Sequence, residues 1–148
     1  MKLVALTLLA FTLFHQPLGC QSASKDDPPT VLWRGIKQAL SGPNGREYFE
    51  QSIKDAVLPT LYGTIVSSTP ADHPNTFLIA MANNSRPEVT LRLKGRLEKP
   101  LPATTPVKFS GVAIAFAKDP FMLTCDVDAV NRGTYSPGKM IKPVSPKY

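Results

Sequence analysis

The second half of the chain consists of short segments in which apolar and polar residues alternate. The clearest is EVTLRLK, residues 88–94, where Val89, Leu91 and Leu93 share one face and polar side chains occupy the other. Alternation with a period of two is typical of a strand that buries one face. Because an isolated strand leaves its backbone groups unpaired, this pattern predicts that the chain folds around a sheet or barrel.

Five short segments after Pro59, the first a β-branched run, the second an apolar run and the other three alternating, predict five strands. They are LYGTIVS (61–67), TFLIAMA (76–82), EVTLRLK (88–94), VKFSGVAIAFAKD (107–119) and PFMLTCDVD (120–128). The fourth changes its alternation at Gly111, which predicts a bulge or bend there. Three prolines within residues 95–106 prevent that stretch from forming a helix or a central strand.

Two amphipathic segments before Pro59 predict helices, over residues 30–40 and 44–58. Their apolar residues recur at helical spacing, and Ser41-Gly42-Pro43 and Pro59 supply the stops. We interpret Trp33 and Tyr48, which lie at helical spacings in the two segments, as core residues.

Five antiparallel strands within about 70 residues are too few for an immunoglobulin-like sandwich, and bending at a glycine is how small barrels close. We therefore predict a mainly β fold, a five-stranded antiparallel barrel of the oligonucleotide/oligosaccharide-binding (OB) type preceded by two helices. LYGTIVSS, NTFLIAMANN, PEVTLRLK and the stretch from PLPATTPVKF to TCDV resemble the OB-fold domains of small exported bacterial proteins. They are also similar to a domain at the end of some bacterial tetratricopeptide-repeat proteins.

The resemblance covers roughly residues 48–127 and implies a fold, but it brings no catalytic residue with it. Many OB folds place a helix between their third and fourth strands, where this chain has the proline-containing residues 97–106. We therefore expect the two N-terminal helices to cap the barrel and to bury Phe49, Ile53 and Val57 against its open end.

The N-terminus has the features of an export signal. Lys2 precedes an uncharged apolar run over residues 3–14. This run matches a signal-peptide core of about 7–15 residues and is shorter than the roughly 20 residues that span a bilayer. We predict that residues 1–19 are a signal peptide, that residues 20–29 form a tether, and that the folded domain occupies residues 30–130.

Cys20 directly follows the signal segment, and PLGC resembles the lipobox of bacterial lipoproteins. Cys20 and the preceding glycine fit the lipobox, whereas Pro17 and Leu18 do not. We predict lipidation of Cys20 and attachment to the membrane of the bacterial cell envelope, facing the periplasm or the exterior. Two alternatives stay open: ordinary cleavage before Lys25, after Ser22-Ala23-Ser24, and a retained N-terminal anchor.

The formal net charge of the chain is +6, from 17 Lys and Arg against 11 Asp and Glu. Removal of residues 1–19 takes away one lysine and leaves 16 − 11 = +5, a mild excess that does not by itself indicate nucleic acid. Residues 131–148 contain four basic side chains and no acidic one. We predict that they form a disordered basic tail.

A basic cluster around the third strand is the candidate ligand site. Its members are Arg86, Arg92, Lys94 and Arg96, which suit an anionic ligand such as a glycan or an acidic surface of an envelope protein. An export signal argues against nucleic acid as the partner. The structural alternative is a solvated strand face.

No catalytic or metal-binding arrangement is evident in the sequence. Asp72-His73 lacks an identifiable nucleophile, and the spacing of Asp119, Asp126 and Asp128 lacks the glycine of a calcium loop. We interpret Cys125 as a small buried hydrophobe. We therefore predict a non-enzymatic envelope lipoprotein, without a cofactor or metal, that carries a binding or scaffolding module. The alternative is a soluble periplasmic protein that binds an anionic ligand through the basic cluster.

Overall fold

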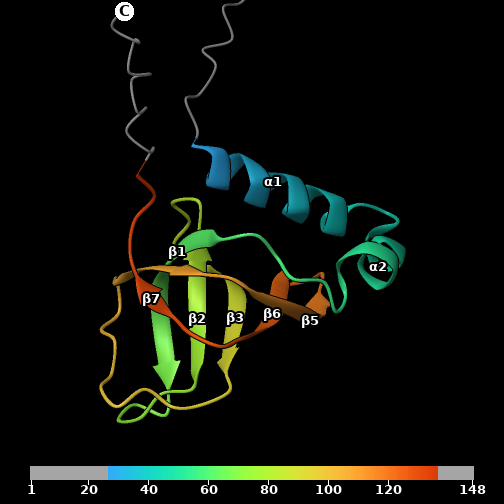
Figure 1. Cartoon of the computed structure of the whole chain (residues 1–148). Coiled ribbons are helices and arrows are strands. Elements are labelled where there is room, and N and C mark those ends of the chain that lie inside the picture. Colours follow the sequence, from blue (N-terminus) through green and yellow to red (C-terminus); the bar gives the residue numbers. More distant parts are fainter. Residues whose placement is uncertain (1–26, 137–148) are drawn as a thin grey trace, which may run out of the picture.

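The computed structural model describes residues 27–136 (Figure 1). The predicted signal peptide, Cys20 and residues 137–148 of the predicted tail lie outside the described residues. Helix α1 (Pro28–Ser41) and the short α2 (Gly45–Tyr48), which continues into the π-helical turn η1 (Phe49–Ile53), precede the strands. The strands are β1 (Leu61–Thr69), β2 (Thr76–Met81), β3 (Pro87–Leu93), β4 (Pro106–Phe109), β5 (Gly111–Ala117), β6 (Met122–Val127) and β7 (Asn131–Arg132). The predicted mainly β fold with N-terminal helices is confirmed.

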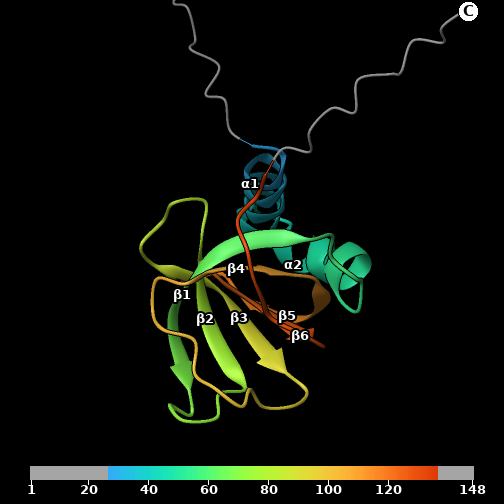
Figure 2. The same ribbon diagram turned by 60° about the vertical axis from the view of Figure 1, so that its left-hand side comes forward.

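All seven strands belong to one sheet in the order β5-β6-β3-β2-β1-β4-β7. Strands β1, β2 and β3 form an antiparallel meander, whereas β3 and β6 are parallel. The hydrogen-bonded order is open, so the five-stranded barrel that we expected is not confirmed. The sheet is strongly curled, because β4 and β5 lie near its opposite ends and only Ser110 separates them in the chain (Figure 2).

The predicted break in the fourth strand segment is confirmed, and it divides that segment into β4 and β5. Gly111 is needed there for close approach, since a Cβ atom at this position would lie 2.5 Å from the carbonyl oxygen of Asp126. The hydroxyl of Ser110 donates a hydrogen bond to the carbonyl of Leu58 at 2.7 Å. The bend thus fixes the segment before β1 against the sheet.

Helix α1 begins earlier than the sequence predicted. The Asp27 carboxylate accepts a hydrogen bond from the backbone amide of Thr30 at 2.8 Å and caps the helix, while Pro28 and Pro29 occupy its first turn. The two prolines therefore belong to the helix and not to the tether. The helix lies across one end of the curled sheet (Figure 1), where it buries Trp33 and Leu40.

The second helix is shorter than predicted. It ends at Ile53, because Asp55 adopts a left-handed conformation with φ of 61° and residues 55–58 then run along β5. Phe49 and Ile53 are buried as expected, but Val57 is 73% exposed. Tyr48, expected in the core, is also partly exposed. The backbone hydrogen bonds between residues 55–58 and β5 replace the last helical turns.

The core lies between the inner face of the sheet and α1 with the turn that follows α2. Cys125 is a free, fully buried thiol in this core, as predicted, and burial raises its pKa to about 12. Residues 131–132, expected to begin the tail, instead pair with β4 as β7. Within residues 27–136, neither helix has the length and apolar character that a membrane crossing requires.

Candidate functional site

A β-bulge at the start of β3 positions one carboxylate. Ile79 of β2 pairs with Val89, but the next pair joins Ala80 to Pro87, so Glu88 is the extra residue. A bulge redirects side chains that strict alternation would send to opposite faces. Glu88 and Val89 are consequently both buried, and Glu88, 4% exposed, is the one buried charged residue among those the structure describes.

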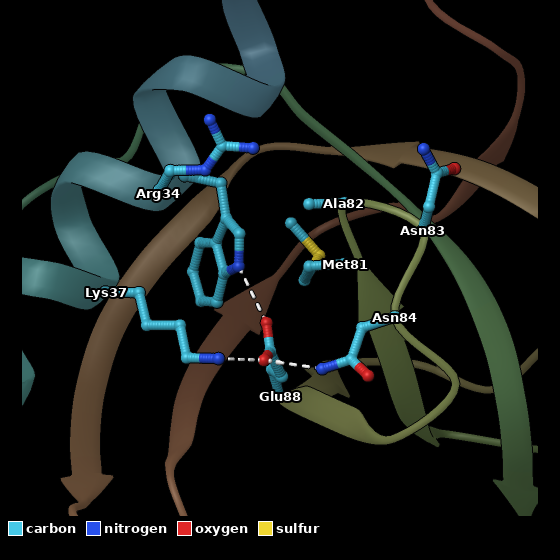
Figure 3. Close-up of a pocket in the computed structure, with 8 residues that line it drawn as sticks. Arg34, Lys37, Met81, Ala82, Asn83, Asn84 and Glu88 are labelled. Atoms are coloured by element: carbon cyan, nitrogen blue, oxygen red, sulfur yellow. Dashed lines mark hydrogen bonds and ion pairs between the residues drawn. The ribbon is translucent and has the colours of Figure 1, made fainter. Parts of the chain in front are cut away.

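Three donors surround the Glu88 carboxylate (Figure 3). The indole Nε1 of Trp33 donates to Oε2 at 2.8 Å, and the amide of Asn84 donates to Oε1 at 2.8 Å. The ammonium of Lys37 forms an ion pair with the same Oε1. Trp33 and Lys37 are four residues apart on α1 and therefore share one helix face. Glu88 thus links α1 to the β2–β3 hairpin.

The protonation state of Glu88 follows from two opposing effects. Burial alone would raise the pKa of this carboxyl, because a low-dielectric environment disfavours the charge. The hydrogen bonds from Lys37, Trp33 and Asn84 outweigh burial and lower the pKa below its usual value. Glu88 is therefore ionised at neutral pH.

An aromatic contact fixes the donors in place. The ring of Phe121, just before β6, packs edge-on against Trp33 with centroids 6.0 Å apart. The ammonium of Lys37 lies 5.7 Å from the centroid of the same Phe121 ring. The side chains that hold Glu88 are therefore restrained by a third segment of the chain.

A hollow of about 340 Å³ opens beside this group, and we call it the Glu88 pocket. Its walls come from α1 and from the β2–β3 turn, and they include Trp33, Arg34, Lys37, Ala82, Asn83 and Asn84. In Figure 3 the side chain of Asn83 points away from Glu88.

Two residues of the β2–β3 turn have a left-handed backbone conformation. Ala82 and Asn83 have φ values of 49° and 61°, and an alanine rarely occupies this left-handed region. The backbone amide of Asn84 donates to the Met81 carbonyl at 2.9 Å, so Ala82 and Asn83 are the central residues of a tight hairpin turn, which requires positive φ at both. This turn forms one wall of the Glu88 pocket.

The pocket is lined mainly by polar side chains. Its polar side chains are mainly hydrogen-bond donors, and its carboxylate already accepts from three partners. A carboxylate with this many donors is a weak base. The single N–H of Trp33 is used by Glu88, so a ligand with hydrogen-bond acceptors would meet the remaining N–H groups of Lys37 and Asn84.

The predicted basic cluster is not brought together as one binding face. Arg92 forms an ion pair with Asp126 at 3.1 Å, and Lys94 with Asp128 at 2.8 Å, so both meet carboxylates at the end of β6. Arg86 precedes β3 and Arg96 follows it, which separates them by at least about 20 Å of strand. The alternative of an anionic ligand on this face therefore gains no support from the arrangement.

The other candidate groups have local roles. The backbone amide of His73 donates to the Asp72 carboxylate at 2.9 Å and lowers the pKa of Asp72, while the His73 ring lies 3.4 Å from the Leu97 carbonyl. Within residues 27–136, His, Cys, Asp and Glu side chains form no group of three that could hold a metal ion.

The sequence analysis did not identify the Glu88 pocket. Strict alternation assigns Glu88 to the solvent face with Thr90 and Arg92. Trp33 was correctly expected to be buried, but its partner lies 55 residues away. The one available signal was Pro87, because a proline at the start of a strand is compatible with an irregular ladder.

The scan against protein-family models returned no match, and no curated protein and no solved structure is significantly similar to the chain. The residues and geometry of this chain are therefore the basis for a functional proposal.

Proposed function

We propose that the protein is a non-enzymatic binding module of the bacterial cell envelope, built on an OB-like barrel and anchored by a lipid on Cys20. Its ligand is a small molecule or chain end with hydrogen-bond acceptors, bound in the Glu88 pocket. The observation that carries this proposal is the donor-lined hollow beside a buried, fully partnered carboxylate. A carboxylate held by three donors keeps the walls of the hollow in one arrangement, which lowers the entropic cost of binding.

The strand connections support an OB-like barrel. If β4 and β5 count as halves of one bent strand, that strand pairs with β1 through its first half and with β6 through its second. Together with the β1–β2–β3 meander and the parallel β3–β6 pair, this is the set of neighbours that a five-stranded ring requires, and β7 is an addition to it. Membership of the group found at the end of tetratricopeptide-repeat proteins is part of the same proposal.

The position of the two ends of the described chain supports membrane attachment. Asp27, where the domain begins, is seven residues after Cys20, so a lipid there would hold the domain within about 25 Å of the membrane. Asp27 and Tyr135 line the same hollow, so the described chain ends close to where it begins. A lipid and a basic segment together give stable attachment.

Titration of the Glu88 pocket tests the binding function. Trp33 is the single tryptophan of the chain and lines the pocket, so its fluorescence reports occupancy. We expect acetate, N-acetylglutamate or glucuronate to change this fluorescence saturably and Arg34→Gln to weaken the effect. Arg46→Gln on α2 is the matched control. The absence of saturation with all three compounds would contradict the proposed site.

Mass spectrometry of the mature N-terminus tests the anchor. Protein purified from bacterial membranes should begin at Cys20 and carry the mass of the lipid. A free amino terminus at Lys25, or an intact N-terminus, would exclude the lipoprotein interpretation and leave the binding site untouched.

A further inference from the structure

A row of polar and aromatic side chains crosses three strands on the outer surface of the sheet. Tyr62 of β1 is directly opposite Lys108 of β4, and Lys108 is directly opposite Asn131 of β7. Residues opposite each other in adjacent strands share a face. Their neighbours Leu61 and Phe109 are buried, so the row faces away from the core.

A second tyrosine extends this row. The ring of Tyr135, just after β7, meets the ring of Tyr62 edge-on, with centroids 5.7 Å apart and an interplanar angle of 78°. Both rings are partly exposed. A tyrosine in this setting offers an apolar ring and a hydroxyl to the same ligand.

Tyr62 lies between two hollows, which together we call the Tyr62 groove. One, of about 300 Å³, is lined by Tyr62, Lys108, Ser110 and Asn131. The other, of about 220 Å³, is lined by Tyr62 and Tyr135 together with threonine hydroxyls and the Asp27 end of α1. Since Tyr62 borders both hollows, a chain-like ligand that occupies both would cross its ring.

The charge of the Tyr62 groove is close to balanced. Its lining has one cationic side chain, Lys108, and one carboxylate, Asp27. Arg132 is opposite the inward-facing Val107 and so lies on the other side of β7. A single-stranded nucleic acid needs a positive track along its phosphates in addition to rings for stacking. The groove therefore suits an uncharged chain-like ligand better than a polyanion.

We propose that the Tyr62 groove is a second ligand site and that it binds a neutral oligosaccharide. A sugar ring presents C–H groups on its face, which pack on an aromatic ring, and hydroxyls at its edge. The amide of Asn131, the ammonium of Lys108 and the hydroxyl of Thr64 lie around Tyr62 to bond those hydroxyls. The hydroxyl of Ser110 donates to Leu58 and can act only as an acceptor toward the sugar. The site is separate from the Glu88 pocket, although Asn83 borders both regions.

The test is a titration of the full chain with maltohexaose, cellohexaose and chitohexaose, followed by the NMR signals of the tyrosine rings. We expect saturable shifts of Tyr62 and Tyr135 with at least one of them, at a Kd of about 1 mM or below. Tyr62→Ala should weaken binding at least about tenfold, which corresponds to 1.4 kcal/mol. Tyr62→Phe, which keeps the ring, should bind within about threefold of the unsubstituted protein. Tyr48→Ala, a partly exposed tyrosine on α2, is the matched control.

Three outcomes would overturn the proposal. The first is the absence of saturable binding with all three oligosaccharides. The second is unchanged affinity in a Tyr62→Ala protein whose Trp33 fluorescence shows that it is folded. The third is tighter, salt-dependent binding of a thymidine oligonucleotide to the same rings. The carboxylate titration of the Glu88 pocket, followed by Trp33 fluorescence, is a separate experiment. Absence of oligosaccharide binding in the Tyr62 groove can therefore be distinguished from absence of carboxylate binding in the Glu88 pocket.

Discussion

The indole Nε1 of Trp33 donates a 2.8 Å hydrogen bond to the carboxylate of Glu88, which lies 55 residues further along the chain. This bond joins the first helix to a bulge at the start of β3. Both side chains are almost completely buried. The position of α1 on the sheet, and with it the shape of the Glu88 pocket, therefore depends on this polar cluster together with the buried apolar residues Ile36 and Leu40.

Replacing Glu88 by glutamine should destabilise the fold. The amide is nearly isosteric, but it removes the charge that Lys37 pairs with and presents an NH₂ group to one of three buried or half-buried donors. We expect a loss of about 1–3 kcal/mol in the free energy of unfolding, measured by urea denaturation. Glu50→Gln, which breaks the exposed Glu50–Lys54 pair, should cost less than about 0.5 kcal/mol. Equal effects of the two substitutions would contradict a structural role for the cluster.

The same cluster predicts how stability depends on pH. The pKa of Glu88 is lowered in the folded state, so its contribution is present above the unfolded pKa of about 4.5 and is lost as the pH falls through the folded pKa. In Lys37→Met the ion pair is gone and burial is opposed only by the hydrogen bonds from Trp33 and Asn84, so the pKa of Glu88 should rise relative to that in the unsubstituted protein. The difference in melting temperature between the two proteins should thus be largest near neutral pH and should narrow below about pH 4.

Lys54→Met is the control for this pH experiment, because it removes a lysine from an exposed pair. Its melting temperature should follow that of the unsubstituted protein across the whole range. If the melting temperature of Lys37→Met differed from that of the unsubstituted protein by the same amount at every pH, the lysine would act only through packing.

The sequence predicted the mainly β class because alternation depends on local burial, which β6 preserves throughout and β3 preserves from Val89 to Leu91. The bend at Gly111 was predictable for the same reason, since the alternation changes there. The bulge at Glu88 was not predictable from the alternation. It results from the pairing of β3 with β2, and the apolar residues of β3 alternate as they would in a regular strand. The exposure of Val57 was also not predictable, because backbone bonds from residues 55–58 to β5 compete with the helix.

The candidate site was less predictable than the fold. A run of basic residues in the sequence shows where positive charge lies along the chain, but not which carboxylates lie beside it in the fold. Arg92 and Lys94 pair with Asp126 and Asp128 because β3 and β6 are adjacent strands. The row of Tyr62, Lys108 and Asn131 likewise depends on the registers of two strand pairs. Both sites are products of tertiary structure.

Substituting Gly111 by alanine tests the bend between β4 and β5. The added Cβ would lie 2.5 Å from the Asp126 carbonyl oxygen and 2.6 Å from a methyl of Val127, so β5 and β6 must separate locally. We expect a loss of about 1–3 kcal/mol in the free energy of unfolding. Gly95→Ala is the control, because a Cβ there has no neighbour within 4 Å. Unchanged stability of the Gly111 variant would exclude the close approach.

The thiol of Cys125 should be unreactive in the folded protein. It is fully buried, and burial raises its pKa to about 12, so very little thiolate exists near pH 8. In a Cys20→Ser background Cys125 is the one remaining thiol of the chain. Iodoacetamide should leave the native protein unmodified over hours and label it within minutes in about 6 M guanidinium, as followed by mass spectrometry. Cys125→Ala in the same background should show no labelling in either condition. Rapid labelling of the native protein would mean that β6 opens readily, and it would contradict the packing of Cys125 between the sheet and its helical cover.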